Sequence, residues 1–285
     1  MGRAEVPTEK ESEVTRIASV TRSEAGSRLR EAERLLAEHP AYHVYRECLA
    51  LQRSIEAVFL PNLRELLALL EQAATDEQLA IELVQNVRPP VVRERFQALV
   101  TQRLHNYLAS TTSLVDHVRR VMRGRSDPLA EEYERRKAAL RQHPEVDFMV
   151  GLRNFTLHRV LPLVGHTLSI QNVNTAGQSM ASEVQLSVAE LLEWKGWSAG
   201  SRTYVKGQGD GVVLRAVVRL HGELIASFSV WLHTQLVTGN AGGIEELNRL
   251  VVARNAELIG GDVGLAKRVT DEWTARRSGL SDLSS

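Results

Sequence analysis

The sequence predicts a mainly α-helical protein with one inserted β-hairpin, and three observations support this fold class. Aromatic residues make up only 5% of the chain, while Leu, Ala, Glu and Arg abound, a composition that favours helices over sheets. Apolar residues recur at steps of three and four through most of the sequence, which is the spacing of one helix face. Two stretches within residues 167–188 instead alternate apolar and polar side chains, as half-buried strands do.

The composition also limits the class of protein. Hydrophobic residues make up 43% of the chain and charged residues 25%, a balance typical of a globular protein with a buried core. The 35 basic and 35 acidic residues cancel, which argues against binding nucleic acid or an anionic membrane through bulk charge. The single cysteine, Cys48, forms neither an intrachain disulfide nor a cysteine-based metal site. Since residues 1–22 hold no apolar signal core, we expect a cytoplasmic protein without membrane contact.

Prolines and polar capping residues divide the first part of the chain into helices. Helical periodicity begins near Ser27 and is interrupted at His39-Pro40 and again at Pro61, because the residue before a proline is disfavoured in helical backbone. A helix ending at residue 39, a second over 41–60 and a third after Pro61 are therefore expected. Asp76 is placed to cap a further short helix.

The longest predicted helix covers residues 91–122, where apolar residues form one broad stripe. Gly124 is typical of the stop after such a helix. Asp127-Pro128 has the pattern of an N-cap followed by a first helical residue, so a new helix should begin there and end at His143-Pro144. The helix after it should run from Glu145 to about Leu161.

The pattern changes after residue 165. Residues 168–173 and 184–188 alternate and are separated by a stretch rich in Gly, Ser and Asn, which predicts a β-hairpin with a long loop. Ser187 and Glu190 have capping-box spacing ahead of another helix. Residues 212–236 keep helical spacing but contain many β-branched side chains, and we favour a helix over strands there.

Two more helices are expected near the C-terminus, one over residues 244–259 and one that includes Trp273. Together the elements predict three regions. Residues 1–26 would be a mobile N-terminal arm, since they are polar and lack apolar periodicity. Residues 27–165 would form a helical bundle, and residues 166–285 would supply a hairpin and helices that pack on it.

The helix predicted over residues 145–161 holds the main functional candidates. It is apolar around most of its circumference, which indicates burial on most sides. One narrow polar stripe remains, at steps of four, three and four residues: Asp147, Gly151, Asn154 and His158. Arg153 lies on a different side among apolar neighbours, where a guanidinium is costly to bury without an anionic partner.

The segment Arg153-Asn154-Phe155-Thr156-Leu157-His158 resembles the motif of HEPN domains, in which an arginine and a polar residue precede three residues and a histidine. HEPN domains are helical bundles that include metal-independent ribonucleases, many of them toxins or phage-defence effectors. The resemblance covers the motif and a bundle of roughly residues 28–165, and it excludes the hairpin and the C-terminal third. It implies a homodimeric endoribonuclease that needs no metal or other cofactor, with an antitoxin or another protein as partner.

The resemblance also implies roles for individual residues. His158 would move a proton while a ribose 2′-OH attacks the adjacent phosphate, since an imidazole can accept and donate protons near neutral pH. Arg153 would hold that phosphate through a bidentate fork, and Asn154 would orient the ring or a partner. HEPN nucleases generally pair their motifs across a dimer, so Asp147 and Gly151 would support the site or its interface.

Other interpretations of the same helix stay open. Arg153 and Asp147 would, in the simplest of them, only close polar contacts with neighbouring helices, and His158 would only stabilise the helix C-terminus. The bundle would then be a non-catalytic interaction protein whose polar stripe meets a partner. A third interpretation is a sensor that binds a small ligand between bundle and hairpin.

Basic residues gather between residues 119 and 141, where eight basic side chains stand against four acidic ones. This local excess predicts an RNA-binding surface, with these residues as its candidates: Arg119, Arg120, Arg123 and Arg125. The alternative is an ordinary solvated helix end. His105 and His117 are twelve residues apart, an offset of about 120° on a helix, so we expect them on different faces. No spacing of histidines, cysteines or carboxylates predicts a metal site.

Overall fold

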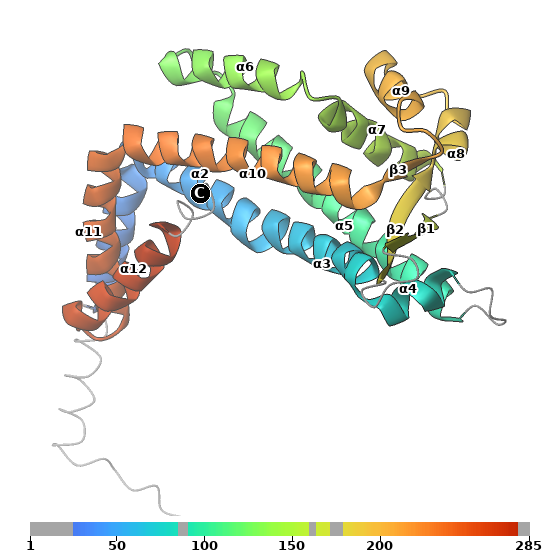
Figure 1. The fold of residues 1–285 in the computed structure, drawn as a ribbon. Coiled ribbons are helices and arrows are strands. Elements are labelled where there is room, and N and C mark those ends of the chain that lie inside the picture. The colour runs from blue at the N-terminus through green and yellow to red at the C-terminus, as the bar shows by residue number, and fades with distance from the viewer. Residues whose placement is uncertain (1–24, 85–90, 160–163, 172–178, 279–285) are drawn as a thin grey trace, which may run out of the picture. The chain divides into compact units, whose positions relative to one another are not determined.

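The structure is a computed structural model that describes residues 25–84, 91–159, 164–171 and 179–278. Most of the arm predicted over residues 1–26 and the loop of the predicted hairpin therefore lie outside the described residues. The chain divides into two compact units, one formed by residues 1–49 with 234–285 and the other by residues 50–233. The mainly α-helical fold with an inserted β-hairpin is confirmed (Figure 1).

The unit of residues 50–233 contains most of the helices and the sheet. Its elements, two of which extend beyond the unit, are α2 (Tyr42–Arg53), η1 (Ser54–Phe59), α3 (Leu60–Thr75), α4 (Glu77–Val84), α5 (Val91–Met122), α6 (Pro128–Leu140), α7 (Pro144–His158), β1 (Val164–Gln171), β2 (Ser179–Ser187), α8 (Val188–Glu193), α9 (Ala199–Lys206), β3 (Gly211–Val213) and α10 (Leu214–Gly239).

Capping residues place several of these boundaries. The Asp76 carboxylate accepts a hydrogen bond from the Leu79 amide at 3.0 Å, and Asp127 accepts one from the Ala130 amide at 3.1 Å. Ser187 caps α8 in the same way. These side chains satisfy amides of the first turn that have no partner inside the helix. The predicted starts of α4, α6 and α8 are therefore confirmed.

Pro61 does not separate two helices as we predicted, because a π-helical segment carries the chain through it. Residues 54–59 form η1, and the Leu60 amide donates to the Ile55 carbonyl, five residues earlier. A proline ring clashes with the carbonyl four residues before it in an α-helix, and it has no amide to donate. The wider π turn just ahead of Pro61 relieves that conflict, so α2, η1 and α3 follow one another without a loop.

The sheet has three antiparallel strands in the order β1-β2-β3. In the hairpin, Val164 pairs with Leu186 and Gln171 with Ser179. The short strand β3 includes the first two residues of the segment for which we favoured a helix, and it pairs with residues 185–187 of β2. Its Val212 is fully buried, which explains the strand. The helix favoured for the rest of that ambiguous segment is confirmed as α10.

The core of this unit lies where α5 meets α10 and α3. Tyr107 of α5 is fully buried and its hydroxyl lies 2.6 Å from Nδ1 of His221 on α10. Gly222 on the same helix faces Leu63 of α3 so closely that an added Cβ would lie 2.5 Å from that side chain. Arg215 of α10 pairs with Glu183 of β2 and at 3.2 Å with Glu71 of α3.

The other unit contains a helix over residues 25–38, part of α2, and the helices α11 (Ala241–Leu258) and α12 (Val263–Ser278). Leu36, Tyr45 and Leu247 form its buried cluster. An ion pair between Arg28 and Glu257 also joins the first helix to α11, at 3.0 Å. Among the described residues of the whole chain, no helix combines the length and apolar character that crossing a bilayer requires.

Candidate functional site

The residues of the motif Arg153–His158 lie on α7, but they do not share one side of it. Arg153 and His158 are five residues apart, which separates them by about 140° around a helix. Arg153 is half-buried and lines a groove against α5, whereas His158 is exposed at the last residue of α7. Within one chain, therefore, these two side chains do not face a common phosphate.

Asp147 and Gly151 are occupied by contacts inside the chain. Asp147 accepts hydrogen bonds from Ser201 at 3.0 Å and from Ser198, both at the start of α9. A Cβ on Gly151 would lie 2.6 Å from the ring of Trp197, so this glycine lets the indole pack directly on the backbone of α7. This side of α7 is a packing surface for the segment from α8 to α9.

Aromatic rings complete that packing. Trp197 stacks on Phe148 and Phe155 of α7 with centroid distances of 5.6 and 5.9 Å. Trp194 packs edge-on against Trp197 at 5.0 Å, and the Trp197 indole donates to the Leu191 carbonyl at 2.5 Å. The buried aromatic cluster holds α7 at a fixed rotation, and it thereby fixes which of its residues turn toward α5.

Arg153 turns toward α5 and has no carboxylate partner among the described residues. Its Nη1 donates to the Asn154 side-chain oxygen at 3.2 Å, and its carbonyl accepts from the Thr156 hydroxyl at 2.9 Å. Asn154 is exposed, like His158. The anionic partner expected for a half-buried guanidinium is thus not supplied by any side chain that the structure describes.

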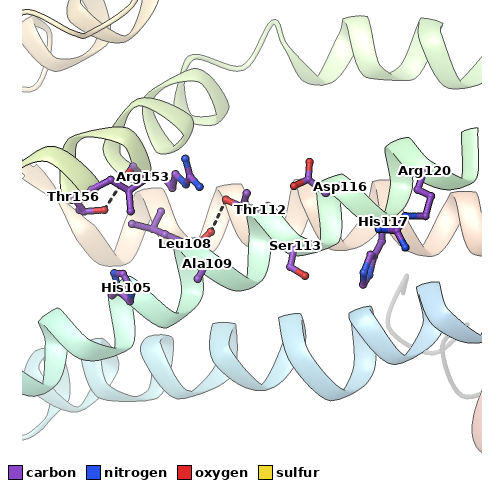
Figure 2. Close-up of a pocket in the computed structure, with 11 residues that line it drawn as sticks. His105, Leu108, Ala109, Thr112, Ser113, Asp116, His117, Arg120, Arg153 and Thr156 are labelled. Atoms are coloured by element: carbon purple, nitrogen blue, oxygen red, sulfur yellow. Dashed lines mark hydrogen bonds between the residues drawn. The ribbon is translucent and has the colours of Figure 1, made fainter. Parts of the chain in front are cut away.

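The groove beside Arg153 has a volume of about 470 Å³ and lies between α5 and α7 (Figure 2). Its polar lining residues are His105, Thr112, Ser113, Asp116, His117, Arg120, Arg153 and Thr156. Arg120 follows His105 by fifteen residues, which corresponds to about 22 Å along α5. Figure 2 shows Arg153 between the two ends of this row. The groove is therefore long and has basic groups at both ends and between them.

Both histidines of α5 line this groove, contrary to our expectation that they lie on different faces. The offset of 120° was correct, but the residues of α5 that line the groove cover a wide arc of the helix, so both rings border it. Among the described residues that line the groove, Asp116 is the only acidic one, and it accepts a hydrogen bond from Arg119 at 3.0 Å. With Asp116 already paired, the groove favours an anionic ligand.

The predicted basic residues divide between this groove and a smaller hollow. Arg120 lines the groove, while Arg119, Arg123 and Arg125 line a hollow of about 290 Å³ between the end of α5 and α6. Arg125 bonds to Asp127 at 2.7 Å, and this hydrogen bond holds the pKa of that carboxyl below its usual range. Arg123 is exposed and has no ion pair in the described structure.

His117 makes a contact that no pattern in the sequence predicts. Its Nδ1 lies within hydrogen-bonding distance of the Ser54 hydroxyl, at the first residue of η1. Ser54 is 63 positions earlier in the chain and lies in a segment that we predicted as ordinary α-helix. Only the packing of α5 on η1 brings these two residues together.

Neither a metal site in the described part of the chain nor a similar known protein indicates what the groove binds. The described residues contain no group of three or more His, Cys, Asp or Glu side chains arranged to hold a metal ion. Comparison of the chain with protein-family models, curated proteins and solved structures gives no match. The function is therefore inferred from the groove and from the residues of α7.

Proposed function

We propose that the groove between α5 and α7 binds the sugar–phosphate backbone of RNA and that the protein cleaves this RNA without a metal ion. The observation that carries the proposal is the row of basic side chains along an open groove, in whose described lining the single carboxylate is already paired. Phosphates repeat along a nucleic acid strand, and a row of cationic groups binds them by neutralising charge and releasing counterions. The local charge excess meets this need although the chain has no net charge.

Arg153 is the proposed phosphate-binding residue. It is half-buried and without a carboxylate partner in the described structure, so its guanidinium can offer two parallel donors to a phosphate. During cleavage the 2′-oxygen would bond to phosphorus, and the 5′-oxygen would leave with the bonding electrons. The 2′-hydroxyl proton passes to an imidazole, the 5′-oxygen takes a proton from solvent, and a 2′,3′-cyclic phosphate remains. Arg153 would stabilise the charge that develops on the phosphate oxygens.

The imidazole for this step would come from a second copy. The exposed face of α7 contains Val150 and Leu157, which are 57% and 53% exposed, with Asn154 and His158 beside them. Two copies that bury these apolar residues against each other would bring His158 of one toward Arg153 of the other. A homodimer of this kind is what the HEPN resemblance implies, and a toxin or phage-defence role with an antitoxin or another protein as partner belongs to the same proposal.

The second candidate is a non-catalytic protein that only binds RNA. It is favoured by one observation, the use of Asp147 and Gly151 for packing inside the chain, because these residues then add nothing to an interface between copies. In this case the groove and Arg153 keep their role, and His158 has none.

The test combines binding and cleavage of a labelled RNA in buffer with EDTA. Arg153→Ala is expected to weaken binding about tenfold, because hydrogen bonds between charged groups are lost. It should also lower the slope of log affinity against log salt by about 0.7. The matched control is Arg93→Ala, since Arg93 is also half-buried on this unit and lies outside the groove. RNA binding that does not depend on Arg153 would refute the proposal.

Cleavage is tested by mixing two inactive variants. Arg153→Ala and His158→Ala should each lose cleavage as pure proteins. In an equimolar mixture half of the dimers would be mixed, each with one complete site, so about a quarter of the wild-type rate should return. Arg153-dependent binding without cleavage in the wild type would leave the non-catalytic candidate. Activity retained in His158→Ala would remove His158 from the mechanism.

A further inference from the structure

Ser54 makes two hydrogen-bonding contacts that together determine which ring nitrogen of His117 carries a proton. Its hydroxyl lies 2.9 Å from the Ala50 carbonyl, one turn earlier, and also contacts Nδ1 of His117. The Ser54 side chain is only 6% exposed, so water does not readily replace either partner. The three groups form a short chain from the backbone of α2 through η1 to the imidazole on α5.

A hydroxyl has one proton to donate, and a carbonyl can only accept. Both contacts are satisfied at once when Ser54 donates to Ala50 and accepts from Nδ1 of His117. The Nδ1 atom must then carry a proton. In the neutral ring this leaves Nε2 without a proton and with a lone pair that can accept a hydrogen bond.

The ring that is fixed in this way borders the groove. His117 is half-buried and lines the groove together with Arg120, which is three residues further along α5. Residues three apart lie side by side on a helix, so a phosphate held by Arg120 would place its ribose beside the His117 ring. No described side chain is hydrogen-bonded to Nε2.

We propose that Ser54 holds His117 as the Nδ1–H tautomer, so that Nε2 accepts a hydrogen bond from a ribose 2′-hydroxyl of the strand in the groove. This inference rests on the proposed RNA binding and adds the reason for choosing RNA over DNA. The 2′-hydroxyl is the group that distinguishes the two backbones, and it can donate to Nε2. Ser54 is a positioning residue here, while His117 contacts the ligand.

The other two histidines near the proposed site do not have this support. His105 lines the groove at the far end and is exposed, and His158 is exposed on α7. Neither has a hydrogen bond to a described residue, so nothing fixes which of their ring nitrogens carries the proton. The hydrogen bond that distinguishes RNA from DNA during binding is therefore assigned to His117, while His158 keeps its proposed role in cleavage.

The first experiment measures the tautomer in the full chain without RNA. Ring ¹⁵N chemical shifts at a pH where His117 is neutral should show a protonated Nδ1 in the wild type. In Ser54→Ala the same signals should move toward a mixture of the two tautomers, and Ser54→Thr, which keeps a hydroxyl, should restore the wild-type shifts. The His105 signals serve as the internal control. A neutral wild-type ring with its proton on Nε2 would overturn the inference.

The second experiment compares an RNA oligomer with the DNA oligomer of the same sequence. The wild type should bind the RNA about tenfold more tightly, the scale expected for one hydrogen bond to an otherwise fixed acceptor. Ser54→Ala and His117→Phe should lose most of this preference while they keep their affinity for DNA, and Ser54→Thr should retain it. Thermal unfolding of each variant identifies any that fail to fold.

The outcomes separate this inference from the proposed function. If the wild type binds neither oligomer, the proposed function fails and the role of Nε2 fails with it. If it binds both equally through Arg153, RNA-groove binding stands and this inference alone is overturned. Selective loss of the RNA preference in Ser54→Ala, together with the tautomer change, would establish the role of the Ser54–His117 pair.

Discussion

The two sides of α5 each pair a histidine with a hydroxyl, and the difference between the pairs is burial. On the inner side, Tyr107 contacts His221 at 2.6 Å, and the two side chains are 0% and 2% exposed. On the groove side, Ser54 contacts His117, which is half-buried and borders open space. The same kind of contact between a histidine and a hydroxyl therefore stabilises the core on one side of α5 and is accessible to a ligand on the other.

Burial has a measurable electrostatic consequence for the inner pair. It lowers the pKa of His221 from the ordinary 6.5 to about 4 and raises that of Tyr107, because water no longer solvates either charged form. Both side chains are thus neutral in the folded protein near neutral pH. The pair therefore stabilises the fold. Its removal should affect folding and should not affect ligand binding, which takes place on the groove side of α5.

The largest expected effect comes from removing the inner hydroxyl and its ring. Tyr107→Ala should lower the free energy of unfolding by about 4 kcal/mol, since it leaves a cavity and an unsatisfied imidazole. The matched control is His105→Ala on the exposed side of the same helix, which should change it by less than about 0.5 kcal/mol. Denaturant titrations of both variants check this. Equal losses would show that the two sides of α5 do not differ as described.

A pH titration of stability should show the next largest effect. Since the pKa of His221 is about 4 in the folded protein and 6.5 for the ordinary group, the unfolded chain binds the proton more tightly. The stability contributed by the neutral ring is complete above pH 6.5 and is lost as the pH falls from 6.5 to 4. Its total is roughly 3 kcal/mol.

His221→Gln isolates this contribution. The glutamine side chain can still accept from the Tyr107 hydroxyl but does not titrate in this range. The difference in unfolding free energy between wild type and variant should therefore shrink by roughly 3 kcal/mol between pH 6.5 and 4, although other groups titrate in both proteins. Parallel curves over that interval would mean that His221 is not buried as a neutral ring.

The two sides of α7 give a comparison of the same kind. Gly151→Ala would place a methyl group 2.6 Å from the Trp197 ring. The indole is stacked and hydrogen-bonded and has little room to move, so we expect a loss of about 2 kcal/mol. Val150→Ala on the exposed face of α7 is the control and should have almost no effect on folding of the monomer. Denaturant titrations followed by the fluorescence of the four tryptophans measure both losses.

The sequence predicted the elements best where the determinants are local. Asp127 and Ser187 cap helices through bonds to residues three positions away, and that information lies within a few letters of sequence. The π segment before Pro61 was missed because proline normally ends a helix, and only the observed backbone shows the wider turn. The strand β3 was missed because three residues are too few to show a period.

The candidate site was predictable only in part, for the same reason. That Arg153 lies on a different side of its helix from His158 follows from five steps of 100°. That it faces α5, and that His117 meets Ser54 across 63 residues, depends on how helices distant in sequence pack. The polar stripe that includes Asp147 and Gly151 was predicted from the sequence. Its partners Trp197 and Ser201 were not, because the spacing of residues on one helix does not indicate which segment packs against it.

Apart from the control variants, Arg153→Ala should have the smallest effect on stability, and it sharpens the comparison most. The guanidinium has no carboxylate partner among the described residues, and its one side-chain bond is to the exposed neighbour Asn154 at 3.2 Å. We therefore expect a change in unfolding free energy of less than about 0.5 kcal/mol. Substitution of buried core residues on these helices should have the opposite result. It should destabilise the fold strongly and leave ligand binding in the groove unchanged. If Arg153→Ala instead destabilises the fold as Tyr107→Ala does, Arg153 is a core-packing residue. The groove then has no cation at its centre that can bind a ligand.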